Sequence, residues 1–440
     1  NTTGIQNTAM GAYALDANTT THYNTAVGYG SLGANTAADN TAVGVNSLLT
    51  NTTGADNVGL GRSALYSNTT ASNNVAVGKN ALWANTTGSE NIAVGALALD
   101  ANTTGTNNIG IGYGALGGNT TADNNTAVGR TALNANTTGA ANVAVGAYAL
   151  DANTTGSSLV AIGKGALGAN TTANDNTAVG DGALLANTTG ASSVAVGKSA
   201  LLVNTTGGYN TAVGVLALDA NTTANYNTAV GYAALTQNST GSENTSMGWG
   251  ALGANTTASY GTAIGSKALA DNTTGANNTA VGERGLYVNT TGANNVAIGA
   301  YALDASNANN NVAIGYDALS ANTSGTRGVA VGYAALDANT TAADNTGIGN
   351  HALGANTTGA SNTAIGSYAL DANTTASHNI AVGREALSAN TTGADNIAIG
   401  SYSLDANTTT SNNVAVGRSS LGSNTAANNT AVGYNTLFAN

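Results

Sequence analysis

Apolar and polar positions recur along this chain with a fixed period. A small residue and a branched apolar residue precede a glycine, as in Ala42-Val43-Gly44, and Leu48 follows four residues later. The block returns every 17 residues, with three intervals of 16, and 26 copies begin between Asn7 and Asn429. Counted from the first residue, usually Asn, position 4 is always Val, Ile, Leu or Met, position 5 is always Gly and position 9 is always Leu. Such internal repetition indicates a repeat architecture.

Each repeat predicts a short strand followed by turns. Positions 2 to 4, such as residues 41–43, contain β-branched residues, which favour extended backbone. The side chains at positions 2 and 4 point one way, and the small residue at position 3 points the other. The unvarying Gly indicates a positive φ or a close backbone approach. We expect a second extended segment at positions 7 to 10, turns in the Asn-Thr-Thr-Gly stretch, and a tolerant loop after position 12, where the short repeats lose a residue.

The period favours an all-β fold, a parallel β-solenoid (β-roll) with one 17-residue repeat per rung. A helix is disfavoured because each repeat contains Gly and lacks an apolar stripe of period 3.6. A leucine-rich repeat needs a longer period and several leucines per unit. We expect residues 1–440 to form a single continuous array of about 26 repeats. We also expect positions 4 and 9 to be buried, and the Asn at position 12 to form an amide ladder, Asn68 on Asn85 and Asn85 on Asn102.

The ends of the sequence suggest a piece of a longer polypeptide. The chain begins Asn1-Thr2-Thr3-Gly4, without an initiator Met, and stops within a repeat. We therefore expect a fragment of a longer chain, and the absence of a signal peptide from it says nothing about export.

Composition narrows the function classes. The 440 residues include 7% charged residues, ten Lys and Arg against 21 Asp and Glu, three distant His and neither Cys nor Pro. The net charge of −11 argues against nucleic acid as a partner. Cysteine-based metal sites are impossible, and no apolar run is long enough for a membrane-spanning helix, so we expect no membrane insertion in this segment.

Charged and aromatic residues concentrate at three repeat positions. Position 6 is predicted to form an exposed ridge of Tyr, Trp and seven of the ten basic residues. Those basic residues are Arg62, Lys79, Arg130, Lys164, Lys198, Arg384 and Arg418. Acidic residues collect at position 10 (Asp16, Asp100, Asp151, Asp219, Asp304, Asp337, Asp371 and Asp405) and at position 17 (Asp56, Glu90, Asp175, Glu243, Asp344 and Asp395).

The string Asn-Thr-Ala-Val-Gly-Tyr-Gly-Ser-Leu-Gly-Ala, residues 24–34, resembles the head repeats of trimeric autotransporter adhesins (YadA-like heads). It is also similar to repeats of phage tail fibres and bacterial surface fibres. Val27, Val43 and Val77 match the apolar strand position, and Gly28, Gly44 and Gly78 match the strand-ending glycine. The resemblance covers nearly the whole chain, although the adhesin heads use a shorter repeat. It implies a parallel β-roll, a homotrimer and an extracellular adhesive or fibre role.

The sequence favours no catalytic, cofactor-binding or metal-binding residues, and we expect no enzyme activity and no cofactor. A near-identical repeat offers no unique constellation for catalysis. Asp123, Asp175, Glu283 and Arg284 are predicted to be solvated loop charges. Calcium is disfavoured because the dense Gly-Asp nonapeptide of calcium-binding β-rolls is missing. Sequons such as Asn18-Thr19-Thr20 follow from the turn chemistry, which leaves sparse glycosylation open.

The leading hypothesis is an extracellular structural fibre or adhesin shaft, located at a cell surface or on a virion. Its expected partners are further copies of the chain, as a homotrimer or a filament, and a host-cell, matrix or surface receptor. The alternative is ice binding by Thr ladders at positions 13 and 14, such as Thr86 and Thr87. Against this alternative, the short repeats lose their residue in that segment, and Ala37, Ala308 and Ala426 interrupt the rows.

Overall fold

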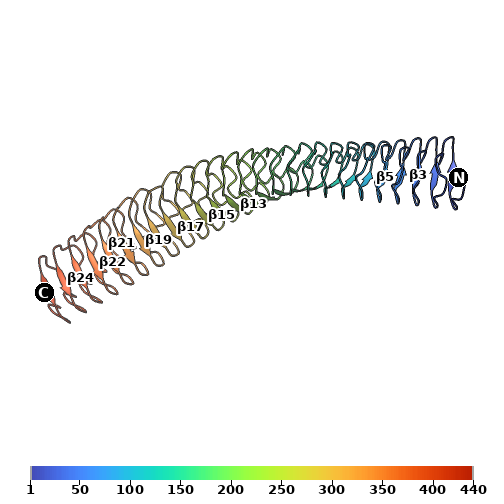
Figure 1. Ribbon diagram of the computed structural model, residues 1–440. Helices are drawn as coiled ribbons and strands as arrows, with labels where there is room; N and C mark the ends of the chain where they lie inside the picture. The colour runs from blue at the N-terminus through green and yellow to red at the C-terminus, as the bar shows by residue number, and fades with distance from the viewer. Residues whose placement is uncertain (1, 439–440) are drawn as a thin grey trace. The chain divides into compact units, whose positions relative to one another are not determined.

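The 17-residue repeat folds as one rung of a parallel β-solenoid, as the sequence predicts. The structure is a computed structural model and describes residues 2–438. The chain forms two compact units, Asn1–Asn225 and Tyr226–Asn440, which are described separately. That residues 1–440 form a single continuous array stays a prediction. In Figure 1 the strands of each unit follow one another in chain order, one strand to a rung.

Every regular element of the described residues is a strand of three residues at positions 2 to 4. The first unit contains β1 (Thr8–Met10), β2 (Thr25–Val27), β3 (Thr41–Val43), β4 (Val58–Leu60), β5 (Val75–Val77), β6 (Ile92–Val94), β7 (Ile109–Ile111), β8 (Thr126–Val128), β9 (Val143–Val145), β10 (Val160–Ile162), β11 (Thr177–Val179), β12 (Val194–Val196) and β13 (Thr211–Val213). The second contains β14 (Thr228–Val230), β15 (Thr245–Met247), β16 (Thr262–Ile264), β17 (Thr279–Val281), β18 (Val296–Ile298), β19 (Val312–Ile314), β20 (Val329–Val331), β21 (Thr346–Ile348), β22 (Thr363–Ile365), β23 (Ile380–Val382), β24 (Ile397–Ile399), β25 (Val414–Val416) and β26 (Thr430–Val432).

Successive strands within each unit pair in parallel and in register. In the first unit Val160 of β10 lies opposite Thr177 of β11, and in the second Val296 of β18 lies opposite Val312 of β19. The rungs are also bonded outside the strands, since the Leu65 N–H donates to the Ala81 carbonyl at 3.0 Å. Each repeat position therefore forms a row along its unit, with one member per rung.

The interior of most rungs contains small residues, one leucine and two asparagines. The Ala at positions 3 and 8 and the Leu at position 9, such as Ala178, Ala183 and Leu184, have no exposed surface. The Asn residues at positions 1 and 12, such as Asn176 and Asn187, are equally buried. The prediction that position 9 is buried is therefore confirmed, and the small residues at positions 3 and 8 lie inside the coil.

Two local expectations were wrong. Positions 7 to 10 form no second extended segment, because positions 7 and 9 adopt left-handed backbone, as at Ser199 (φ 57°) and Leu201 (φ 52°). Position 4 is not buried, because the strand turns its small residue toward the interior. The invariant Gly meets both conditions proposed for it. Gly61 has φ 135°, and a Cβ there would lie 2.6 Å from the carbonyl oxygen of Gly78 in the next rung.

Candidate functional surfaces

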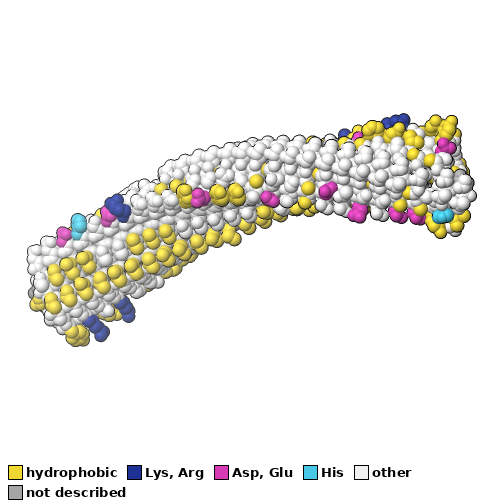
Figure 2. Space-filling model, in the orientation of Figure 1, with side chains coloured by type: hydrophobic (Ala, Val, Ile, Leu, Met, Phe, Trp, Pro, Cys, Tyr) yellow, Lys and Arg dark blue, Asp and Glu magenta, His cyan; other side chains and the backbone are white. Residues whose placement is uncertain are grey.

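The outward side chains of the strands form an uncharged surface, apolar at position 4 and Val, Ile or Thr at position 2, and the sequence pattern did not assign it to the outside. We call the side chains at positions 2 and 4 of each unit its outer strip. Ile162, Val196 and Val213 at position 4 are 41%, 36% and 37% exposed, whereas the Ala residues between positions 2 and 4 are buried. The strip has no charged residue in any of the 26 strands. In Figure 2 hydrophobic side chains form bands over the strands of the second unit.

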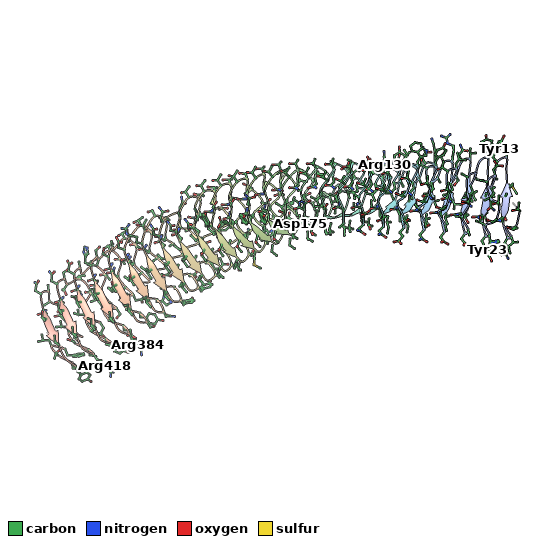
Figure 3. All side chains as sticks on the ribbon, viewed as in Figure 1. Tyr13, Tyr23, Arg130, Asp175, Arg384 and Arg418 are labelled. Atoms are coloured by element: carbon green, nitrogen blue, oxygen red, sulfur yellow. The ribbon has the colours of Figure 1, made fainter. Side chains whose placement is uncertain are left out.

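Two rows of polar and charged side chains border the outer strip. Position 6 follows the strand after the invariant Gly, and Lys79, Arg130, Lys164 and Lys198 are exposed there, as predicted. The last position of the preceding repeat lies on the other side of the strand, and its side chains are also exposed, as at Asp175. Figure 3 shows Arg384 and Arg418, both at position 6, projecting away from the ribbon. The strip therefore has one border rich in basic residues and another rich in acidic ones.

Aromatic rings at positions 6 and 7 contact one another along five consecutive rungs of the second unit, alternately edge to face and stacked. The ring centroids of Tyr301, Tyr316, Tyr333, His351 and Tyr368 follow one another at 5.8, 5.6, 5.4 and 5.5 Å. Tyr316 and Tyr333 are about half exposed. Because both positions face solvent, a ring at position 7 can contact a ring at position 6 of the next rung. We call these five residues the aromatic row, which the sequence analysis did not identify.

The carboxylates at position 10 are partly buried, which the sequence did not indicate. Burial raises the pKa of Asp100, Asp151, Asp304, Asp337, Asp371 and Asp405 above the ordinary value for aspartate. Arg284 forms an ion pair with Asp304 at 3.1 Å and lies 4.5 Å from the ring centre of Tyr287. Arg284 is therefore not the free, solvated loop charge that we expected. Asp123 is also engaged, since it accepts a hydrogen bond from the Thr106 N–H at 2.7 Å.

The threonine rows at position 13 are bonded within the solenoid. The Thr69 hydroxyl donates to the Thr86 carbonyl at 3.0 Å, and Thr86 and Thr103 repeat the bond. A hydroxyl that donates to the protein is not free to donate to an ordered water lattice. The ice-binding alternative is therefore not favoured.

The asparagines at position 12 form the predicted ladder. The Asn85 amide donates to the Asn68 side-chain oxygen at 2.9 Å, and Asn102 donates to Asn85 at 2.9 Å. Asn51 and Asn390, which begin sequons, are buried and donate from the nitrogen to which a glycan would be attached. The fold therefore excludes N-glycosylation at these two positions.

A second asparagine ladder, at position 1, was not predicted. Asn57 there accepts from the Asn74 N–H at 3.0 Å and donates to the Ala71 carbonyl at 2.9 Å. The frequency of Asn at position 1 was the available sequence signal. Its role depends on the carbonyl of position 15 approaching it, a contact that spacing alone does not reveal.

The hollows on the two units are open and shallow. One, in the first unit, is bordered by Asp100 and Tyr113 and arises where Gly114, Gly117 and Gly118 leave out side chains. Another, in the second unit, lies beside Tyr368 and Asp371. Within residues 2–438 no group of three or more His, Asp or Glu could hold a metal ion. A search of the same residues finds no helix with the length and apolarity needed to cross a membrane.

Neither a protein-family model nor a curated protein matches this sequence. The parallel β-solenoid implied by the resemblance to adhesin heads is present in the structure. Membership of that family stays a hypothesis based on the motif at residues 24–34.

Proposed function

We propose that this chain is an extracellular structural shaft, part of a fibre or an adhesin, which presents polar ridges for attachment to a surface. The observation that carries the proposal is the repetition of one rung in parallel register, with the same inward residues and the same bonds to the next rung. Because such a rung can be added many times without a new fold, the length of the solenoid increases with the number of repeats. Each 17 residues add roughly 4.8 Å, the spacing of neighbouring strands.

The bonds between rungs support a mechanical role. Within each unit a rung is joined to the next by strand pairing, by backbone bonds in the turns and, except at the short repeats, by the Asn ladder at position 12. Asn187, for example, donates to Asn170 at 3.1 Å and to the carbonyl of Gly190 in its own repeat at 2.9 Å. Because each repeat contacts mainly its neighbours, stability is approximately a sum over rungs and their contacts.

Attachment is assigned to the exposed ridges. The position 6 residues recur at the rung spacing, so one partner molecule can contact several of them, which raises avidity without any single tight site. In the second unit the aromatic row offers a partner five neighbouring rings, of which Tyr316 and Tyr333 are about half exposed. The proposed partners are a host-cell, matrix or surface receptor and further copies of the chain, and the proposed location is a cell surface or a virion.

Immunogold labelling of the intact source cells or particles tests the location. Antibodies raised against residues 1–440 are expected to label the outer surface before any permeabilisation. Labelling that requires permeabilisation and is confined to the cell interior would contradict the extracellular shaft.

Binding of the purified chain to cells or matrix separates a ridge that attaches from a passive shaft. A variant with Tyr316→Ser, Tyr333→Ser and Tyr368→Ser is expected to bind more weakly if the aromatic row attaches to a receptor. Its matched control carries Ser324→Ala, Thr341→Ala and Thr375→Ala, at exposed position 14 of the same rungs. Equal binding by both variants would assign attachment to another ridge. If the unaltered chain does not bind, the chain is a passive shaft without an attachment function.

A further inference from the structure

We propose that the outer strip is the interface through which this chain associates with a second copy of itself, with the two solenoids running parallel. The proposal rests on the proposed function and assigns its self-association to a named surface. It depends on three properties of the strip: its composition, its area and the charges along its two borders.

The composition of the strip is that of an interface centre. Val and Ile are buried in most proteins, and large continuous apolar patches on a surface mark interaction sites. Here position 4 is an exposed or half-exposed apolar residue in every rung, as at Ile348, Ile365 and Ile399, which are 38%, 40% and 40% exposed, and position 2 is Val, Ile or Thr. An interface typically has an uncharged centre and a polar rim. The uncharged strip and its charged borders have this arrangement.

The area of the strip within one unit is sufficient for a specific contact. Thirteen strands spaced roughly 4.8 Å apart, with three residues of roughly 3.3 Å each, give a footprint of roughly 600 Å². Two copies meeting on this footprint would bury about 1,200 Å² in total, the lower end of the range for stable protein–protein interfaces. A second copy supplies a strip of the same length and the same rung spacing.

The borders determine the direction. In the first unit the position 6 border includes Arg62, Lys79, Arg130, Lys164 and Lys198, and the opposite border includes Asp39, Asp56, Glu90 and Asp175. When two copies are related by rotation about an axis along the solenoid, the position 6 border of one copy lies beside the acidic border of the other. In the antiparallel arrangement, the basic borders would face each other. Complementary charges favour the parallel pair and like charges disfavour the antiparallel one.

The measured mass of charged variants tests the interface. The strip variant carries Val145→Lys, Ile162→Glu, Val179→Lys and Val196→Glu, with alternating signs so that adjacent rungs do not repel. Its matched control carries Thr155→Lys, Thr172→Glu, Thr189→Lys and Thr206→Glu, at exposed position 14 of the same four rungs. By light scattering, the unaltered chain and the control are expected to have a multiple of 42.5 kDa. The strip variant is expected to have the mass of one chain, with an unchanged circular dichroism spectrum.

Two mass results would overturn the interface. The unaltered chain could have the mass of one chain at every concentration, or the strip variant could keep the mass of the control. Either result leaves the shaft standing if immunogold still labels the outer surface, so the two failures are distinguishable. A strip variant that has lost its circular dichroism spectrum is replaced by one with Ile162→Glu alone, which should dissociate at a higher concentration than the control.

Thiol cross-linking tests the direction. The chain contains no Cys, so Asn73→Cys on the acidic border and Lys79→Cys on the basic border each introduce a single thiol. The two positions lie on opposite sides of the strand, six residues apart, a separation of at most about 20 Å, and the cross-linker is a short bifunctional maleimide. An equal mixture of the two variants is expected to give cross-linked pairs, and each variant alone is not. Cross-linking of Lys79→Cys to itself, or none in the mixture, would overturn the parallel arrangement.

Discussion

Two apolar rows run along each unit, and they lie on opposite sides of the backbone. Position 9 is Leu in every repeat and position 4 is always an apolar residue, so their recurrence in the sequence is nearly equal. Yet Leu167 is fully buried, whereas Ile162, five residues earlier, is 41% exposed. Recurrence and hydrophobicity thus identify both rows as structurally important without saying which one lies inside.

Backbone conformation separates the two rows. Every Leu at position 9 has a positive φ, 52° at Leu167, whereas position 4 belongs to a strand. A β-branched side chain is especially unfavourable at a positive φ, and a γ-branched Leu is tolerated better. In a strand the preference is reversed, and Val or Ile fits the pleated backbone. The choice between Leu alone and Val or Ile therefore reports the local conformation, which the hydrophobic pattern does not.

The largest expected difference between the rows follows from burying a charge. Leu167→Asp should destabilise its rungs by about 4 kcal/mol or more, because the carboxylate would be buried without a partner. Ile162→Asp, on the exposed row, should cost about 1 kcal/mol through lost strand preference and packing. Urea unfolding of dilute protein, with limited proteolysis to locate the opened rungs, measures both. Equal costs would show that the two rows do not differ in burial.

A smaller change tests the conformational explanation. Leu167→Val should cost about 2 to 3 kcal/mol, because it removes a methylene and places a β-branched residue at a left-handed position. Leu167→Met keeps the volume and should cost less than about 1.5 kcal/mol. Val179→Leu, in the strand, should cost less than about 1 kcal/mol. The same urea midpoints check these values, and a Val variant as stable as the Met variant would contradict the argument from φ.

Acid should stabilise the rungs that carry a half-buried Asp beside the Leu row. Burial raises the pKa of Asp100 and Asp151, so the folded chain binds protons more readily than the unfolded chain. The stability linked to these groups is fully present below the unfolded pKa of about 3.9 and is lost as pH rises through the raised pKa. The urea midpoint should therefore be higher near pH 4 than at pH 7.

Two variants attribute that pH dependence to particular groups. Asp151→Asn should reduce the gain in the urea midpoint on acidification, since it removes a carboxylate whose pKa is raised. Asp344→Asn should increase the gain, because the hydrogen bond from Arg327 lowers the pKa of Asp344 and gives the opposite sign. A midpoint that falls steadily from pH 7 to pH 4 in all three proteins would contradict the assignment.

Much of the fold was predictable because a tandem repeat displays its own constraints. The rung length, the strand at positions 2 to 4, the buried Leu and the Asn ladder at position 12 all follow from the period and from residue preferences. The direction of the strand was not predictable from alternation alone, because three residues define two faces without ranking them. The Leu of the following turn fills the interior, so only a small residue such as Ala161 fits inside the strand. The aromatic row was missed because only position 6 was expected to form an exposed ridge, whereas position 7 was assigned to a second extended segment.

The smallest expected effect concerns the inward polar row, which, unlike the Leu row, is interrupted. At each short repeat the position 12 ladder is broken. The side-chain oxygen of the position 12 Asn in the preceding rung then accepts no hydrogen bond from position 12 of the short repeat. At two breaks a Thr at position 15 provides the missing donor, Thr21 to Asn18 and Thr410 to Asn407. At the third break, beside Ser306, position 15 is Gly292. There the side-chain oxygen of Asn289 is the one buried side-chain polar atom without a partner within residues 2–438.

A Cβ at Gly292 would clash with the carbonyl oxygen of Ala308, so Gly292→Thr requires the backbone to shift. Its hydroxyl would satisfy the buried Asn289 oxygen, and we expect the variant to be about 1 kcal/mol more stable than a Thr variant with the same steric cost and no such acceptor. Gly275→Thr is the control, because position 15 of the preceding repeat is also crowded, with a Cβ there in the same kind of clash with the carbonyl oxygen of Gly292. The side-chain oxygen of Asn272, beside this position, already accepts a hydrogen bond from the Asn289 amide at 2.8 Å. Gly275→Thr therefore restricts the unfolded chain as Gly292→Thr does, but its hydroxyl does not satisfy an unpaired acceptor. The difference between the two urea midpoints isolates the hydrogen bond. Equal midpoints would mean that the Asn289 oxygen is satisfied by solvent, and that a break in the inward polar row has no measurable cost.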